Sequence, residues 1–242
     1  MGEALTTVLT ASLEAIAPPT CAACGGDVET WAQVACRPCH DTFEPMVGPH
    51  CSVCGTPFAA DTPFGPPRPC GRCAGQPPSF ERARAFGAYG GALEELVAAF
   101  KFRGRRDLAK PLAALMALTL DDGFEGIDLV APVPLSRRRL RERGYDQAWL
   151  LARALGGLLH IPSAPRALRR TRHTAPQTTL SATGRRHNVH GAFEMGPDGV
   201  VAADILLVDD VFTTGATAGE CARILMRSGA SRVRVVTVAR AS

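Results

Sequence analysis

The sequence predicts an α/β protein, in which a parallel sheet with helices on both faces is preceded by a small cysteine-rich zinc-binding domain. Eight of its 9 cysteines fall into four Cys-x-x-Cys pairs before residue 74, and strand-like and helix-like segments alternate from residue 85 onward. A composition of 46% hydrophobic and 21% charged residues supports a buried core and excludes an intrinsically disordered chain. We expect an N-terminal helix and a double zinc-binding domain over residues 1–80, and the α/β domain over residues 81–242.

The four cysteine pairs predict two structural Zn²⁺ sites. Thiolates separated by two intervening residues can face one tetrahedral metal, and two such knuckles complete a four-cysteine site. The predicted ligands are Cys21, Cys24, Cys36, Cys39, Cys51, Cys54, Cys70 and Cys73. Sequential and interleaved pairings of the knuckles use the same residues, and we favour the sequential one. His40 and His50 are interpreted as bystanders, and the lone Cys221 as a small core residue.

Before the knuckles, apolar residues recur at helical spacing over residues 5–16, and Pro18 and Pro19 end the pattern. This helix is expected to pack on the second domain. After the last knuckle, residues 75–79 read as a linker rich in Gly and Pro. Strands are then expected around residues 85–89, 127–131, 205–208 and 232–239. Helices are expected around residues 93–100, 108–120, 147–159 and 217–227, and no internal repeat is visible.

The most informative segment follows the strand at residues 205–208. Asp209 and Asp210 stand at its carboxyl end, and a small, hydroxyl-rich loop then opens a helix. Such a loop offers backbone N–H groups and the positive end of a helix to a phosphate. The candidate phosphate-binding residues here are Val211, Phe212, Thr213, Thr214, Gly215, Ala216 and Thr217. If both acids are to reach one ligand the chain must turn at this point, because neighbours in a continuing strand face opposite sides. Neither a P-loop nor a G-x-G-x-x-G pattern occurs.

This segment resembles the 5-phosphoribosyl-1-pyrophosphate (PRPP) signature of type I phosphoribosyltransferases. Further stretches make the chain similar to the ComF family (competence protein F/GntX-like): residues 18–24, 101–104, 133–135, 141–147 and 185–193. The resemblance implies a type I phosphoribosyltransferase fold with an N-terminal zinc-binding extension and a PRPP site. It also implies a role in handling incoming single-stranded DNA in competent bacteria.

Carried over to this chain, the resemblance places Asp209 and Asp210 at the sugar and its Mg²⁺ as candidate catalytic residues. Other residues expected at the phosphates are Lys101, Pro134, Leu135, Arg143 and Arg185. Arginine suits a pyrophosphate because its fork donates two hydrogen bonds at once. The chain departs from the family in having Tyr145 and Asp146 where Phe and Asn are usual. If that Asn donates to a ligand phosphate, an ionised Asp146 could not replace it.

Charge divides the chain into parts. Residues 1–81 hold 3 basic against 8 acidic residues, residues 82–186 hold 19 against 9, and residues 187–242 hold 5 against 6. The basic middle could bind the phosphates of single-stranded DNA as well as a pyrophosphate. Stacking platforms are scarce there, with Tyr145 and Trp149 the nearest candidates.

Three functions therefore compete. The chain is a PRPP-binding protein of DNA uptake that acts with single-stranded DNA and competence-machinery proteins, an active phosphoribosyltransferase with an unknown nucleophile, or a zinc-ribbon interaction module. The segment of residues 205–217, which contains both acids and the whole hydroxyl-rich loop, favours the first two functions. No apolar run is long enough for a membrane span, and the acidic start of the chain is unlike a secretion signal, so a cytoplasmic location is expected.

Overall fold

The computed structural model describes residues 20–29, 34–59, 61–120, 123–172, 189–199 and 203–241. The helix expected over residues 5–16 and the candidate ligand Arg185 lie outside the described residues. None of the described helices is long and apolar enough to cross a membrane.

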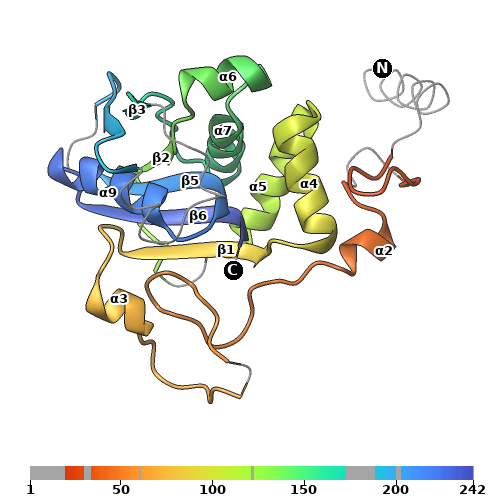
Figure 1. Cartoon of the computed structure of the whole chain (residues 1–242), viewed down its shortest axis with the longest axis horizontal. Helices are drawn as coiled ribbons and strands as arrows, with labels where there is room; N and C mark the ends of the chain where they lie inside the picture. Colours follow the sequence, from red (N-terminus) through yellow and green to blue (C-terminus); the bar gives the residue numbers. More distant parts are fainter. Residues whose placement is uncertain are drawn as a thin grey trace.

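A four-stranded parallel sheet forms the centre of the α/β region (Figure 1). Its order is β1 (Arg82–Ala88), β6 (Arg232–Arg240), β5 (Asp204–Phe212) and β2 (Leu129–Pro132). The central strands β5 and β6 are paired from Asp204 with Arg232 to Phe212 with Arg240. Each contains consecutive buried apolar residues, Ile205–Val208 in β5 and Val235–Val236 in β6, which is typical of strands that are buried on both faces.

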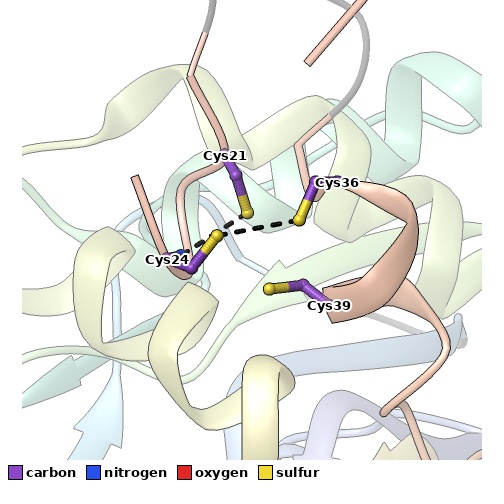
Figure 2. A group of neighbouring side chains, drawn as sticks. All are labelled: Cys21, Cys24, Cys36 and Cys39. Atoms are coloured by element: carbon purple, nitrogen blue, oxygen red, sulfur yellow. Dashed lines mark hydrogen bonds between the residues drawn. The ribbon is translucent and has the colours of Figure 1, made fainter. Parts of the chain in front are cut away.

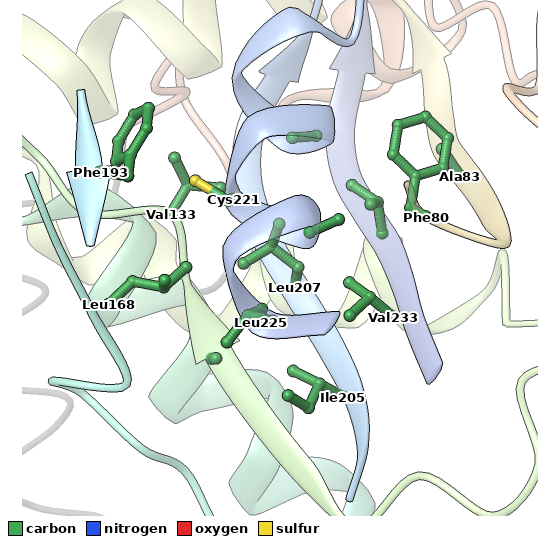
Figure 3. Close-up of a cluster of buried hydrophobic side chains, with 14 of the residues drawn as sticks. Phe80, Ala83, Val133, Leu168, Phe193, Ile205, Leu207, Cys221, Leu225 and Val233 are labelled. Atoms are coloured by element: carbon green, nitrogen blue, oxygen red, sulfur yellow. The ribbon is translucent and has the colours of Figure 1, made fainter. Parts of the chain in front are cut away.

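Helices cover both faces of this sheet, as predicted. On one face, α4 (Gly91–Phe102), α5 (Ala109–Ala117) and α7 (Gln147–Leu159) pack on Leu206 and Val236. On the other face, α9 (Ala216–Arg227) packs on Leu207 and Val233 (Figure 3). Cys221 of α9 is fully buried in this second cluster, which agrees with its prediction as a core residue.

Several elements differ from the sequence prediction. A 3-10 turn (Arg106–Leu108), helix α6 (Arg137–Arg143) and the antiparallel pair β3 (Leu168–Arg170) and β4 (Phe193–Met195) were not predicted. The strand expected over residues 205–208 is longer than predicted, because β5 continues through Asp209 and Asp210 to Phe212 and the chain turns only afterwards. Strand β2 pairs with β5 only as far as Val208, so the two acids lie beyond the end of their neighbour on that side.

The cysteine-rich segment lies along β1, the edge strand of the sheet. The Met46 N–H donates to the Phe86 carbonyl over 2.8 Å, and the Ala88 N–H donates to the Glu44 carbonyl over 2.9 Å. The Ala83 N–H donates to the Val53 carbonyl over 2.7 Å. The segment therefore satisfies backbone groups that an open sheet edge would expose. It also contains two short helices, α2 (Arg37–His40) and α3 (Gly71–Gly75).

Candidate functional site: two zinc sites and a cavity at the sheet edge

The first zinc site brings together Cys21, Cys24, Cys36 and Cys39 (Figure 2). Their sulfur atoms all lie within 4.8 Å of one another, and the Cys24 and Cys36 sulfurs are 3.6 Å apart. A tetrahedral site with Zn–S bonds of about 2.3 Å has sulfurs about 3.8 Å apart. The donor set and its spacing therefore fit Zn²⁺.

The second zinc site is formed by Cys51, Cys54, Cys70 and Cys73 within the same limit of 4.8 Å. The Cys54 and Cys70 sulfurs are 3.9 Å apart, again as a tetrahedral thiolate site requires. Burial opposes ionisation of Cys54, but hydrogen bonds from the Thr56 side chain and backbone outweigh it and lower the pKa of this thiol to about 6. A thiolate is the form that binds metal, so this hydrogen bonding favours metal binding.

These two groups confirm the sequential pairing and the prediction of two four-cysteine sites. Neither group includes a histidine, and the His50 Nδ1 donates instead to the Gly48 carbonyl over 2.8 Å. The two sites are built alike, since Cys36 is the N-cap residue directly before α2 and Cys70 is the N-cap residue directly before α3. The structure thus reveals a local repeat that we did not predict from the sequence.

A cavity of about 700 Å³ opens at the carboxyl ends of the strands, where ligands usually bind in parallel α/β sheets. Most of the predicted phosphate-site residues line it. These are Lys101, Pro134, Leu135, Arg143, Asp209, Asp210, Val211, Phe212, Thr213, Gly215 and Thr217. Thr214 and Ala216 line an adjoining hollow of about 240 Å³ instead, and Gly215 borders both spaces.

The two acids at the end of β5 lie in different surroundings. Asp210 forms an ion pair with Lys101 at 2.8 Å between Oδ1 and Nζ. Burial, and then the neighbouring Asp210 carboxylate, raise the pKa of Asp209 to about 7, although the Asp210 N–H donates to its Oδ1 over 2.9 Å. Asp209 therefore keeps a proton more readily than an exposed aspartate does.

The loop after the acids is fixed by Phe212 and Gly215. Gly215 has a φ of 75°, and a Cβ there would lie 2.6 Å from the Phe212 ring. Only glycine fits such a left-handed position against an aromatic ring. Helix α9 begins directly after Gly215, so its first N–H groups border the loop, as an anion site requires.

Asp146 has a structural role that the family comparison had left open. Its Oδ1 accepts the Trp149 N–H over 3.0 Å and so caps α7, and its Oδ2 accepts the Leu135 N–H over 3.4 Å. Burial raises the pKa of Asp146, and these backbone donors oppose that shift. Asp146 therefore connects α7 to the Pro134–Leu135 turn by accepting one hydrogen bond on each carboxylate oxygen. An Asn has a single accepting side-chain oxygen and would keep only one of these two contacts in the same orientation.

Phe102, Arg139, Gln147 and Arg170 also line the cavity, although none of them was among the predicted site residues. The sequence placed Arg139 and Arg170 only within the basic middle of the chain, and Phe102 and Gln147 only within the motifs at residues 101–104 and 141–147. Gln147 is almost fully buried and its Nε2 has no hydrogen-bond partner among the described residues. Its Oε1 accepts from Arg143 over 2.8 Å, which orients that guanidinium. The sequence did contain a signal for this residue. Gln147 directly follows Asp146, the N-cap of α7, so its amide side chain is in the first turn of that helix.

Comparison with known proteins shows which family has this architecture. A model described as a double zinc ribbon domain matches residues 12–74. Competence protein F of Haemophilus influenzae is 32% identical over 228 residues, which cover 91% of this chain and 96% of that protein. DNA utilization protein YhgH of Escherichia coli K12 is 35% identical over 199 residues, covering 76% and 87%. The chain belongs to the ComF family. Competence protein ComFC of Bacillus subtilis is a more distant member, 26% identical and covering 80% of this chain and 78% of that protein.

Solved structures give weaker similarities. A PRPP amidotransferase from B. subtilis has a TM-score of 0.37 at 18% identity, covering 57% of this chain and 30% of that one. Adenine phosphoribosyltransferase from Thermoanaerobacter pseudethanolicus has a TM-score of 0.35 at 13% identity, covering 57% and 83%.

Proposed function

We propose that this ComF-family protein binds PRPP with Mg²⁺ in the cavity and handles single-stranded DNA during DNA uptake. One observation carries the ligand assignment. The acidic pair Asp209–Asp210, the loop residues Thr213, Gly215 and Thr217, and the basic side chains of Lys101 and Arg143 all line the same space. An acidic end for a sugar with its metal and a basic end for phosphates together match a phosphorylated sugar.

Carboxylates suit Mg²⁺, which would neutralise part of the pyrophosphate charge when bound. In the described structure the Lys101 ammonium group is paired with the Asp210 carboxylate. For each group to contact the ligand, this ion pair would open. Lys101 is then available to a phosphate while Asp210 faces the sugar hydroxyls or the metal. Arg143, which Gln147 holds at 2.8 Å, completes the basic side.

Isothermal titration with PRPP and Mg²⁺ tests this assignment. The double variant Asp209→Asn/Asp210→Asn removes both charges with little change in shape, and we expect it to bind at least tenfold more weakly, the loss expected for charge-assisted contacts. The control is Asp61→Asn, an exposed acid in the second zinc segment. Equal affinities for the double variant and the wild type would refute the site.

The DNA role is supported by the relatives' names, competence protein F and DNA utilization protein, and by the arginines of α6. Fluorescence anisotropy with a single-stranded oligonucleotide across a salt series tests it. Affinity should fall steeply as salt rises, because phosphate contacts release counterions. A salt-independent affinity would contradict the proposal.

A second candidate function is phosphoribosyl transfer. The hollow of about 240 Å³ beside Thr214 and Gly215 offers space for an acceptor next to the loop. In that reaction the bond from the ribose C1 to the pyrophosphate oxygen breaks, pyrophosphate leaves with the electron pair, and C1 bonds to the acceptor. Pyrophosphate release that depends on an added nucleobase would establish transfer. If PRPP binds but no pyrophosphate is released when nucleobases are added, transfer is refuted and only the binding role stands.

A further inference from the structure

Phe102, the last residue of α4, presents an aromatic ring at the cavity. Its side chain is 69% exposed, and it lines the cavity between Lys101 and Gly104. Of the large exposed apolar side chains in the described part of the chain, only Phe102 lines this space. The others are Val47, Phe64, Leu118, Leu140, Leu158 and Met226. A single exposed apolar residue needs no explanation, but one at the wall of a ligand cavity does.

One face of this ring is already occupied by a cation. The Arg143 guanidinium carbon lies 4.9 Å from the Phe102 ring centroid. Arg143 is in turn held by Gln147 at 2.8 Å, and Gln147 is buried in the first turn of α7. The ring is therefore supported from one side by a fixed guanidinium, while its remaining surface is open to solvent.

The charge around the ring suits a polyanion. Arg139 and Arg143 line the cavity with it, and both lie on α6. Glu142 also lines the cavity, but its Oε1 accepts from Arg138 Nε over 2.7 Å, so its charge is paired. An aromatic platform within a basic groove is the arrangement by which proteins bind single strands without sequence preference.

We infer that a nucleobase stacks on the open face of Phe102, with Arg143 on the opposite face and Arg139 beside a flanking phosphate. The inference rests on the proposed function in one respect, namely that the stacked base belongs to single-stranded DNA. A free base, as the acceptor of a transfer reaction, would use the same stacking chemistry. Tyr145, one of the platforms expected from the sequence, is buried and its hydroxyl donates to the Phe100 carbonyl, so it cannot serve.

Anisotropy with a fluorescein-labelled dT oligonucleotide tests the inference on the full-length zinc-loaded protein. We expect Phe102→Ala to weaken binding roughly 5- to 100-fold, as loss of one stacked base requires. Phe102→Trp should retain or improve affinity. The matched control is Phe64→Ala, because Phe64 is also exposed, at 86%, and does not line the cavity.

The salt dependence separates stacking from charge. Phe102→Ala should leave the slope of log affinity against log salt unchanged, whereas Arg139→Gln should reduce its magnitude by about 0.7, the value for one contact to a single-strand phosphate. An oligomer of abasic sites should bind the wild type and Phe102→Ala equally. The inference would be overturned if Phe102→Ala bound the dT oligonucleotide as tightly as the wild type. It would also be overturned if Phe64→Ala lost as much affinity as Phe102→Ala.

A fluorescent free base identifies the source of the ligand. Stacking quenches 2-aminopurine, so its titration in the presence of PRPP should show quenching that Phe102→Ala abolishes if a free base binds. If the wild type binds no oligonucleotide but quenches the free base, the DNA role fails and the stacking site stands. If neither ligand binds while PRPP does, the stacking site is refuted and the PRPP site remains.

Discussion

The two zinc sites have the same local construction but very different surroundings. In the first, the Gly25 N–H donates to the Cys21 carbonyl over 2.8 Å, and in the second the Gly55 N–H donates to the Cys51 carbonyl over 2.9 Å. Of the first four ligands only Cys21 is buried, whereas three of the second four are. Those three, Cys51, Cys54 and Cys73, belong to the same core cluster as β5, β6 and α9. The second site is thus part of the α/β core, and the first lies at its periphery.

The second site is also connected to the loop of residues 213–217, the proposed phosphate loop. Arg240 at the end of β6 donates to the Cys54 carbonyl over 2.7 Å and to the Thr56 hydroxyl. Its guanidinium carbon lies 4.9 Å from the centroid of the Phe212 ring, the ring that packs under Gly215. The first site contacts α4 instead, through Thr42, whose hydroxyl accepts the Ala92 N–H over 3.3 Å. The same ligand motif therefore supports the cavity in one case only.

Removing one ligand from each site should show this difference most strongly. We expect Cys73→Ser to lower the free energy of unfolding by about 4 kcal/mol and Cys39→Ser by about 2 kcal/mol, because only the former also disrupts the core. Urea unfolding followed by circular dichroism measures both. Zinc analysis should find one equivalent lost from each variant. Equal destabilisation would mean that the burial of the second site contributes nothing.

The glycines that follow the two knuckles offer a smaller and better matched comparison. Gly25 and Gly55 have φ values of 77° and 71°, but a Cβ on Gly25 meets nothing within 4 Å, while one on Gly55 lies 2.7 Å from the Ala83 carbonyl oxygen. Gly25→Ala should cost about 1 kcal/mol, the penalty for a left-handed residue. Gly55→Ala should cost about 2–4 kcal/mol, because the clash with β1 adds to it.

Thermal unfolding of the two alanine variants measures this difference. Asn tolerates the left-handed region better than Ala, so Gly25→Asn should recover part of the loss at the first site. At Gly55 the same change should recover nothing, because the clash remains. Similar melting temperatures for Gly25→Ala and Gly55→Ala would show that the knuckle moves away from β1 at little cost.

The sequence predicted best what depends on local spacing. The Cys-x-x-Cys spacing identified all eight cysteines of the two zinc sites. The apolar pattern of residues 147–159 gave the bounds of α7. Contacts between distant segments were not predictable. Gly25 and Gly55 follow identical motifs and differ only in what packs against them. The strand predicted to end at Val208 continues to Phe212 because it pairs with β6, and no local signal at the two acids reports a partner strand.

The connection through Arg240 should give the smallest change in global stability but a local one at the cavity. Arg240→Lys keeps the charge and loses the fork that reaches both Cys54 and Thr56, since a lysine is a point donor. We expect about 1 kcal/mol of destabilisation and faster hydrogen exchange at the amides of residues 213–217, because Phe212 loses the guanidinium above its ring. Arg37→Lys at the first site is the control, as Arg37 is exposed and its Nε forms an ion pair with Asp41 at 3.7 Å. Unchanged exchange at the loop in Arg240→Lys would mean that the second zinc site stabilises the core without positioning the phosphate loop. An equal rise in Arg37→Lys would show that the effect is general rather than transmitted through Arg240.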